Sequence, residues 1–301
     1  MTADKSGHGP RWLTMPPFPG HFDSPAPSAD VRVDFGARSR QSPQRPANED
    51  HYLILRLGRA QETLLTSLPD GEVPRRFDEF AYGMVIADGV GQAGEAASRL
   101  AVSTLAHLAV YFGKWNVRID EPIAEEVMDR AERFYKNVDS TLVQAGRRTP
   151  LGLQSTLTAV YTAGDELFFV HVGDSRAYLF RDNELMQLTH DHHSGHGLIG
   201  SPSVDIADRS QDLHQALKST LGRTGVGGPR IDIERCGLLD GDAILLCTNG
   251  LTDAVDDARI ADALRQGGTA DDRCRALINL AINEQGHDDV TALVAQYSIP
   301  E

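Results

Sequence analysis

Acidic side chains stand beside the ends of several strand-like segments of this sequence. Asp88 follows the apolar run 81–87, and further carboxylates flank similar runs in RPANEDHY, HVGDSRAY and GHDDVTAL. Mg²⁺ and Mn²⁺ prefer oxygen ligands, usually a few carboxylates with water completing the shell. Without a cation, like charges about 4 Å apart near a protein surface repel each other by several kcal/mol. Each residue alone could be an ordinary turn residue, but together they predict a site for hard cations. The set comprises Glu49, Asp50, Asp88, Asp174, Asp288 and Asp289.

Three glycines after the same strand offer a second interpretation. Gly89, Gly91 and Gly94 have the G-x-G-x-x-G spacing of a dinucleotide-binding turn. Such a turn has glycine directly after the strand, where Asp88 would repel a pyrophosphate. The fingerprint also needs a second parallel strand about 20 residues later, and that part of this sequence has a helical pattern. The sequence therefore disfavours a dinucleotide site.

The segments that must position these carboxylates are short strands joined by short turns, such as 163–165 and 181–183. Connections of this length form antiparallel hairpins, because parallel strands need long crossovers. We read 59–78 as a long irregular hairpin connection. The predicted strands are Val31–Phe35, His51–Leu57, Phe80–Ala87, Ser155–Tyr161, Leu167–Val172, Ala177–Phe180, Arg230–Cys236, Ala243–Cys247 and Val290–Tyr297.

Helices interrupt the strands in blocks. Apolar residues recur at helical spacing over 97–109 and over 123–142, the second with Asp120 as its predicted N-cap. A third helix is predicted to begin at Thr269, with Asp272 completing a capping box. Hairpins with helices in separate blocks indicate an α+β fold with helices packed on antiparallel sheets.

Composition narrows the possible partners. The 301 residues carry a formal net charge of −14, which argues against nucleic acid as a partner. No apolar run is long enough for a membrane span, and we see no secretory signal. The three cysteines lack C-x-x-C spacing, so we expect reduced thiols in a cytoplasmic protein.

Two segments differ from the rest of the chain. Residues 1–30 contain six prolines and few aliphatic residues, and we interpret them as a mobile tail before a domain over 31–299. Residues 190–228 are rich in His, Ser, Gly and Asp, and we expect a flap with a short helix over Gln211–Leu221. His190, His192, His193 and His196 could suit a transition metal, but a flap without a dedicated metal site is the favoured interpretation.

An ordered set of motifs resembles the metal-dependent protein phosphatases of the protein phosphatase 2C family, bacterial branch. The motifs are RPANED (45–50), IADGVG (86–91), GLQSTLTAVY, HVGDSRAYLFRDNELMQLTHDHH, GDAILLCTNGLTD (241–253) and GHDDVTALV. The resemblance extends over most of 31–297. It implies a four-layer αββα sandwich of two antiparallel sheets flanked by helices, with two Mn²⁺ or Mg²⁺ ions at one end.

The resemblance also implies residue roles. Asp88 would bridge the two cations, the Gly89 carbonyl and Glu49 would help to hold one, and Asp288 with residue 249 would hold the other. Asp50 would support the cluster, and Asp174 is a candidate ligand of a third, weaker site. A metal-activated water would then attack phosphoserine or phosphothreonine in proteins phosphorylated by a serine/threonine kinase. Arg45 would bind two phosphate oxygens.

Two positions depart from the family pattern. Val90 stands where many members have a histidine proposed as general acid, and Asn249 stands at the metal-binding aspartate of S-D-G. An amide oxygen can bind Mg²⁺ or Mn²⁺ but brings no negative charge. Three hypotheses follow: a slow phosphatase with weakened metal binding, a phosphatase-like regulator that binds phosphoproteins without hydrolysis, or an introduced substitution that traps a substrate. The acidic residues that remain favour an active enzyme.

Overall fold

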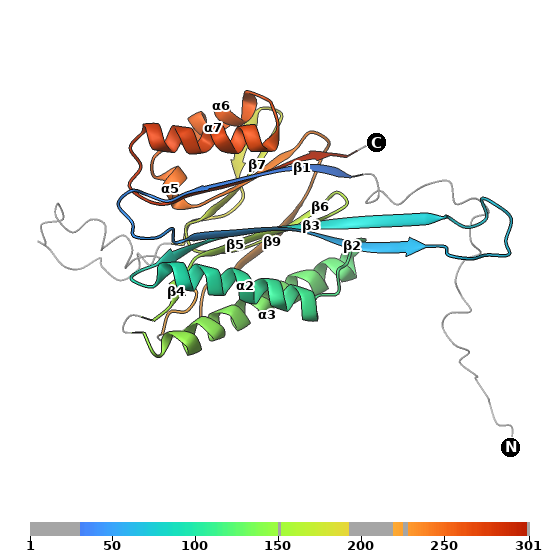
Figure 1. Ribbon diagram of the computed structural model, residues 1–301, viewed down its shortest axis with the longest axis horizontal. Helices are drawn as coiled ribbons and strands as arrows, with labels where there is room; N and C mark the ends of the chain where they lie inside the picture. The colour runs from blue at the N-terminus through green and yellow to red at the C-terminus, as the bar shows by residue number, and fades with distance from the viewer. Residues whose placement is uncertain (1–30, 150–151, 193–218, 225–227, 300–301) are drawn as a thin grey trace, which may run out of the picture.

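The computed structural model has two antiparallel sheets packed face to face, with helices on both outer faces (Figure 1). The structure describes residues 31–149, 152–192, 219–224 and 228–299. The predicted α+β class and four-layer sandwich are confirmed. The predicted tail 1–30 and most of the predicted flap 190–228 lie outside the described residues. Within that flap, Leu221 forms a β-bridge with Ser155.

The first sheet has the strand order β1-β11-β10-β7-β8. The helices α5, α6 and α7 cover its outer face (Figure 1). Strand β10 is buried along its whole length because helices lie on one side and the second sheet on the other, which explains its unbroken apolar sequence. The elements are β1 (Arg32–Arg40), β7 (Arg176–Arg181), β8 (Glu184–Gln187), β10 (Ala243–Cys247), β11 (Val290–Ser298), α5 (Asn249–Thr252), α6 (Asp257–Arg265) and α7 (Ala270–Asn283).

The second sheet has the order β2-β3-β5-β6-β9, and the short strand β4 pairs with the end of β3. Helices α2 and α3 cover its outer face (Figure 1). As predicted, Asp120 caps α3 by accepting a hydrogen bond from the backbone N–H of Ile123. The elements are β2 (Asp50–Glu62), β3 (Arg76–Val90), β4 (Gln154–Ser155), β5 (Leu157–Ala163), β6 (Glu166–Val172), β9 (Asp232–Gly237), α2 (Gly94–Phe112) and α3 (Glu121–Gly146).

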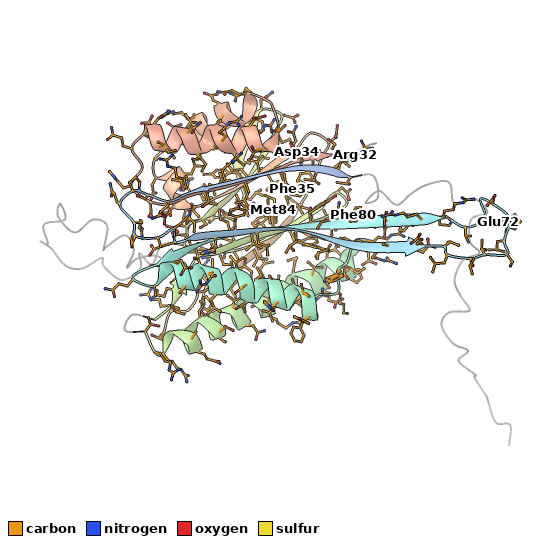
Figure 2. All side chains as sticks on the ribbon, in the orientation of Figure 1. Arg32, Asp34, Phe35, Glu72, Phe80 and Met84 are labelled. Carbon is orange, nitrogen blue, oxygen red and sulfur yellow. The ribbon has the colours of Figure 1, made fainter. Side chains whose placement is uncertain are left out.

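The core fills three interfaces between these four layers. Figure 2 shows Phe35 of β1 and Met84 of β3 in the space between the two sheets, where Ile244 and Leu293 also pack. Separate apolar clusters join each sheet to its own helices. Each sheet is therefore covered on both faces, and the side chains available for chemistry lie at the strand ends.

Strand register places the acidic segments at one end of the sandwich. In the second sheet, Asp50 at the start of β2 pairs with Asp88 near the end of β3. In the first sheet, Arg40 at the end of β1 pairs with Val290 at the start of β11, next to which β10 also ends. Side-chain hydrogen bonds from Thr248 and Thr291 to Asp50 then join the two sheets at this end.

The expected irregular connection 59–78 is wrong at both ends, where 59–62 belong to β2 and 76–78 to β3, whereas 63–75 lie outside the strands. Strands β2 and β3 stay paired out to Glu62 and Arg76, and this hairpin extends beyond the rest of the sheet (Figure 1). The guanidinium group of Arg56 lies 4.6 Å from the centre of the Phe80 ring across the pair, and such cross-strand contacts stabilise the ribbon. Little of the ribbon is covered by other elements, so most of its residues can be polar. The sequence of these residues therefore does not show the pattern that predicts a strand.

Three short elements were absent from the sequence interpretation: β8, α5 and α6. Strand β8 and helix α5 have only four residues each. Helix α6 has nine, and its buried residues Ile260, Ala261, Ala263 and Leu264 follow a helical spacing that the sequence interpretation missed. Tertiary packing stabilises such short elements. Among the helices that the structure describes, none has both the length and the hydropathy needed to cross a membrane.

The N-terminal cap of α7 tests the capping box that the sequence predicts at Thr269. Thr269 accepts a hydrogen bond from the backbone N–H of Asp272, whose carboxylate accepts from the backbone N–H of Thr269. We expect Thr269→Ala to lower the free energy of unfolding by about 1 kcal/mol, measured by urea titration. Thr269→Ser keeps the hydroxyl group and should lose much less; an equal loss in both variants would contradict a role for the cap.

Candidate metal and phosphate site

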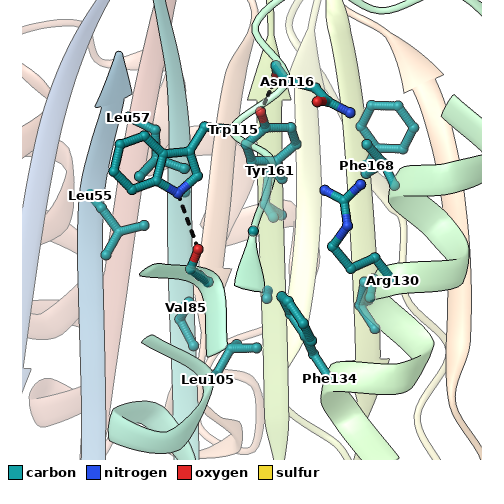
Figure 3. Close-up of a pocket in the computed structure, with 18 of the residues that line it drawn as sticks. Leu55, Leu57, Val85, Leu105, Trp115, Asn116, Arg130, Phe134, Tyr161 and Phe168 are labelled. Carbon is teal, nitrogen blue, oxygen red and sulfur yellow. Dashed lines mark hydrogen bonds between the residues drawn. The ribbon is translucent and has the colours of Figure 1, made fainter. Parts of the chain in front are cut away.

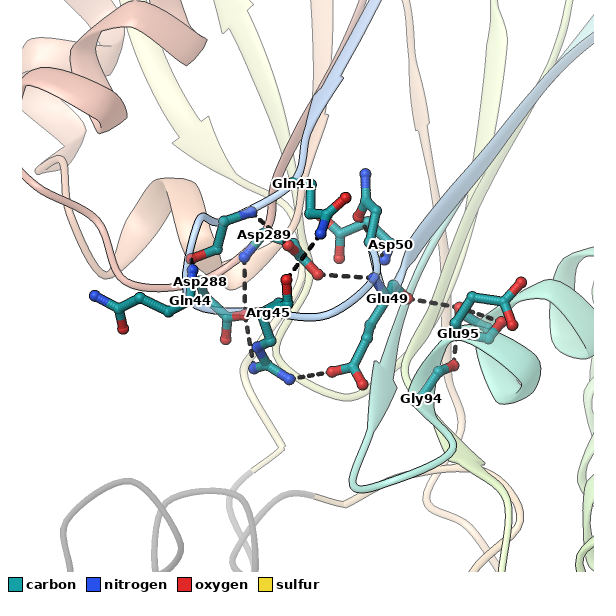
Figure 4. Close-up of polar contacts among 12 residues, drawn as sticks. Gln41, Gln44, Arg45, Glu49, Asp50, Gly94, Glu95, Asp288 and Asp289 are labelled. Atoms are coloured by element: carbon teal, nitrogen blue, oxygen red, sulfur yellow. Dashed lines mark hydrogen bonds and ion pairs between the residues drawn. The ribbon is translucent and has the colours of Figure 1, made fainter.

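Arg45 lies between two acidic side chains that come from opposite ends of the chain. Its guanidinium group pairs with Glu49 and, through Nη2, with Asp288 Oδ1 at 2.7 Å (Figure 4). Burial disfavours the charged form of Arg45, but the negative charges of Asp288, Glu49 and Asp88 outweigh this effect and raise its pKa. The predicted phosphate-binding arginine is thus in direct contact with two of the predicted metal ligands.

Asp289 holds the loop that carries Arg45 and Glu49. Its carboxylate accepts hydrogen bonds from the backbone N–H groups of Ser42 and Glu49, both at 2.7 Å, and its side chain is buried. The sequence placed Asp289 in the acidic set but gave it no role. The motif marks Asp289 only as a second carboxylate where the family pattern G-x-D-N has an amide. It does not give the role, because Ser42 and Glu49 lie 247 and 240 positions away along the chain.

Asp50 connects the two sheets behind this loop. Its Oδ2 atom accepts hydrogen bonds from Thr248 at 2.8 Å and from Thr291 at 2.7 Å. Its buried Oδ1 atom has no hydrogen-bond partner among the described residues. Burial raises the pKa of the Asp50 carboxyl to about 7, against the two hydroxyl groups, which lower it. A buried carboxylate oxygen without a donor is stabilised by a proton or by a cation.

Asp88 is fixed through its backbone at the end of β3. Its N–H donates to the Thr156 hydroxyl at 2.9 Å, and its carbonyl accepts from the Thr156 N–H at 2.8 Å. The Thr156 hydroxyl also bonds to that of Ser175, at 2.8 Å. Since Ser175 follows Asp174, this chain of contacts ties the predicted third-site residue to the strand end that carries Asp88.

Close packing accounts for Gly94, and the backbone conformation accounts for Gly91. A Cβ atom on Gly94 would lie 2.6 Å from the Gly89 carbonyl oxygen and 2.7 Å from Cδ of Glu49. Gly91 has a φ of +84°, a backbone conformation that residues other than glycine rarely adopt. The glycine spacing therefore serves a tight turn from β3 into α2 and leaves room for the Glu49 carboxylate.

Asn249 is the first residue of helix α5, which begins two residues after the end of β10. Its amide Nδ2 donates to Asp253 Oδ2 at 3.0 Å, and its side chain is buried. The next residue, Gly250, packs so tightly on the 286–289 turn that a Cβ atom there would lie 2.0 Å from the Asp289 carbonyl oxygen. The backbone thus brings position 249 beside the segment that carries Asp288.

The donor set suits a hard cation, although the side chains are not arranged around one. Its members present carboxylate, amide and carbonyl oxygens, and the buried Oδ1 of Asp50 lacks a partner among the described residues. In the described part of the chain, no three acidic, histidine or cysteine side chains converge on one point as ligands would. The guanidinium group of Arg45 pairs with both Glu49 and Asp288.

His192 is engaged within the protein. Its Nε2 atom pairs with Asp232 Oδ2 at 2.8 Å, and the backbone N–H of Gly173 donates to its Nδ1 atom at 3.4 Å. Both ring nitrogens of His192 are therefore in contact with other residues of the protein. His193 and His196 lie outside the described residues.

Comparison with known proteins gives the family. A family model described as protein phosphatase 2C matches residues 75–274. The serine/threonine protein phosphatase PstP of Mycobacterium tuberculosis is 33% identical over 218 residues, which cover 70% of this chain but 40% of PstP. The serine/threonine phosphatase stp of Listeria innocua is 28% identical, over 72% of this chain and 84% of its own length. The chain belongs to the protein phosphatase 2C family.

Solved structures agree with this assignment. The catalytic domain of PstP, crystallised in complex with two manganese ions, superposes with a TM-score of 0.62 at 27% sequence identity. The match covers 89% of this chain and 99% of that domain. The chain thus spans about two fifths of the mycobacterial relative but nearly all of its catalytic domain.

The turn after Asp88 can be tested without any assay of function. Replacing a helical glycine by alanine normally stabilises a protein. At Gly94, however, the added methyl group would collide with Gly89 and Glu49. We expect Gly94→Ala to lower the free energy of unfolding by about 1–3 kcal/mol, measured in urea. Gly228→Ala, where a Cβ atom meets nothing within 4 Å, should change it by less than about 0.5 kcal/mol. Equal effects would show that the Gly94 turn is not crowded.

Proposed function

We propose that this chain is a serine/threonine protein phosphatase that hydrolyses phosphoserine and phosphothreonine at a site for two Mn²⁺ or Mg²⁺ ions. The observation that supports this most strongly is the convergence of Arg45, Glu49 and Asp288 at the strand ends. The PstP catalytic domain, a relative with the same fold, was crystallised with two manganese ions. The proposed ligands are Glu49, Asp50, Asp88, the Gly89 carbonyl, Asn249 and Asp288, with Asp174 for a weaker third site.

Arg45 has two roles in this proposal. In the structure, its positive charge offsets Glu49 and Asp288. Bound cations would supply that charge instead and activate the attacking water. The guanidinium group, which presents two parallel N–H donors, would then be available to hold two phosphate oxygens and to orient the phosphorus for attack. Lysine could not replace this fork.

Asn249 makes the proposed site weaker than a full carboxylate set. Its amide oxygen contributes a dipole where the family motif has a charge, and its Nδ2 atom is directed to Asp253. Even residues that only contact metal ligands change affinity or activity about 10–100-fold when replaced, so a change in a ligand itself should cost at least as much. A phosphoprotein-binding regulator without turnover is the alternative outcome.

The proposed substrates are proteins phosphorylated by a serine/threonine kinase of the same cell. We propose a cytoplasmic location, to which the unpaired thiols of Cys236, Cys247 and Cys274 are suited. We also propose that residues 31–299 form the catalytic domain, with 1–30 as a tail and 190–228 as a flap segment. The acidic surface is compatible with phosphoproteins because Arg45 provides the local positive charge.

Hydrolysis of a phosphothreonine peptide across a Mn²⁺ titration tests the proposed activity. We expect metal-dependent phosphate release that Arg45→Ala reduces strongly, through both KM and kcat. The exposed Arg133, on helix α3, provides the matched control: Arg133→Ala should leave both constants unchanged. If neither the natural chain nor Asn249→Asp releases phosphate at saturating Mn²⁺, the enzyme proposal fails. In that case, tight binding of the phosphopeptide that is lost in Arg45→Ala would support the regulator.

Asn249→Asp tests the ligand assignment. Restoring the carboxylate should tighten Mn²⁺ binding by roughly 10-fold or more, measured by calorimetry. Asn137→Asp adds the same charge at an exposed position of α3 and should have little effect, so that long-range attraction is separated from ligation. Equal gains in both variants, or none in Asn249→Asp, would remove residue 249 from the site.

A further inference from the structure

A cavity lies between helices α2 and α3 and the outer face of the second sheet. Its volume is about 160 Å³. Leu55 and Leu105 form part of its apolar wall, and aromatic residues that include Trp115, Phe134, Tyr161 and Phe168 complete much of it (Figure 3). The proposed phosphatase site uses none of these residues.

The charged residues that line this cavity are both basic. Lys114 and Arg130 line it, and among the described residues no acidic side chain does. Both cations pair with the same oxygen atom of Glu126, at 2.6 Å and 2.8 Å. Two positive charges share one negative charge, so the rim keeps a net positive charge in a chain whose net charge is −14.

A buried donor is directed to the same place. The Nδ2 atom of Asn116 is buried without a hydrogen-bond partner among the described residues. Tyr161 donates its hydroxyl hydrogen to the Asn116 carbonyl, which holds this residue at the cavity. Figure 3 shows the Asn116 side chain and the Arg130 guanidinium group near one another, beside Phe168. The Arg130 side chain is only 12% exposed and is paired with Glu126. The Nδ2 atom of Asn116, which has no partner among the described residues, is buried where an unmet hydrogen bond is costly.

Size and polarity together define the ligand class. An apolar cavity of about 150 Å³ binds benzene, so this cavity has room for one aromatic ring. A carboxylate would meet the charge of Arg130 and the free amide hydrogen atoms of Asn116. Binding pockets commonly combine apolar walls with a few such convergent polar groups. We propose that this cavity binds a small aromatic carboxylate, with the ring among the aromatic side chains and the carboxylate on Asn116 and Arg130.

Trp115 provides the readout of binding. The sequence contains two tryptophans, Trp12 and Trp115, so the full chain with Trp12→Phe reports from the cavity alone. Titration with phenylacetate should change its fluorescence in a saturable way, with a Kd of about 1 mM or tighter. Phenethylamine, which carries a positive charge on a similar frame, should not bind.

Variants test whether the carboxylate of the ligand binds at Arg130. Arg130→Met should weaken phenylacetate binding roughly 10-fold or more, whereas Arg133→Met, on the exposed face of the same helix, should not. Ala159→Leu would put extra methyl groups into the cavity and should also weaken binding; if it does not fold by circular dichroism, the arginine pair decides. No saturable change, equal binding of phenethylamine, or equal effects of the two arginine variants would each overturn the proposal.

Discussion

The mutual repulsion of carboxylates at one end of the sandwich is the constraint on which the rest of this site depends. Glu49, Asp50, Asp88, Asp288 and Asp289 approach one another in a partly buried region, where their charges are stable only beside positive charge. In this structure Arg45 provides it by pairing with Glu49 and Asp288. Burial also raises the pKa of Glu49, against the positive charge of Arg45. A region that needs so much positive charge is chemically suited to divalent cations.

The fold is built to keep these charges together. Each sheet is covered on both faces, and its strand ends carry the polar residues. Pairing of Asp50 with Asp88 fixes one side of the site, and the Thr248 and Thr291 hydroxyl groups join it to the other. Asp289 then holds the Arg45 loop through two backbone N–H groups. The acidic residues are thus positioned by backbone pairing and by contacts between the two sheets, none of which uses the Arg45 side chain.

Much of the fold and of the candidate site could be predicted from the sequence because the residues that indicate them are close together along the chain. The helical period over 123–142, the cap at Thr269 and the acidic residues at strand ends each depend on neighbours along the chain, and the structure bears out these elements. The extent of the β2–β3 ribbon could not be predicted, because its contacts cross between strands. The pairing of Arg45 with Asp288 and the role of Asp289 join residues more than 200 positions apart, so no local pattern encodes them. The aromatic cavity depends in the same way on how α3 packs on the sheet.

The central claim is that these distant carboxylates share divalent cations and that the Arg45 guanidinium group is then available to hold phosphate. Anomalous diffraction from a crystal soaked in Mn²⁺ tests it most directly. The account predicts two manganese peaks beside Asp88, one also within about 2.1 Å of an Asp288 oxygen, with the guanidinium group of Arg45 moved away from Glu49. Absence of peaks there at saturating Mn²⁺, with Arg45 still between Glu49 and Asp288, would contradict it.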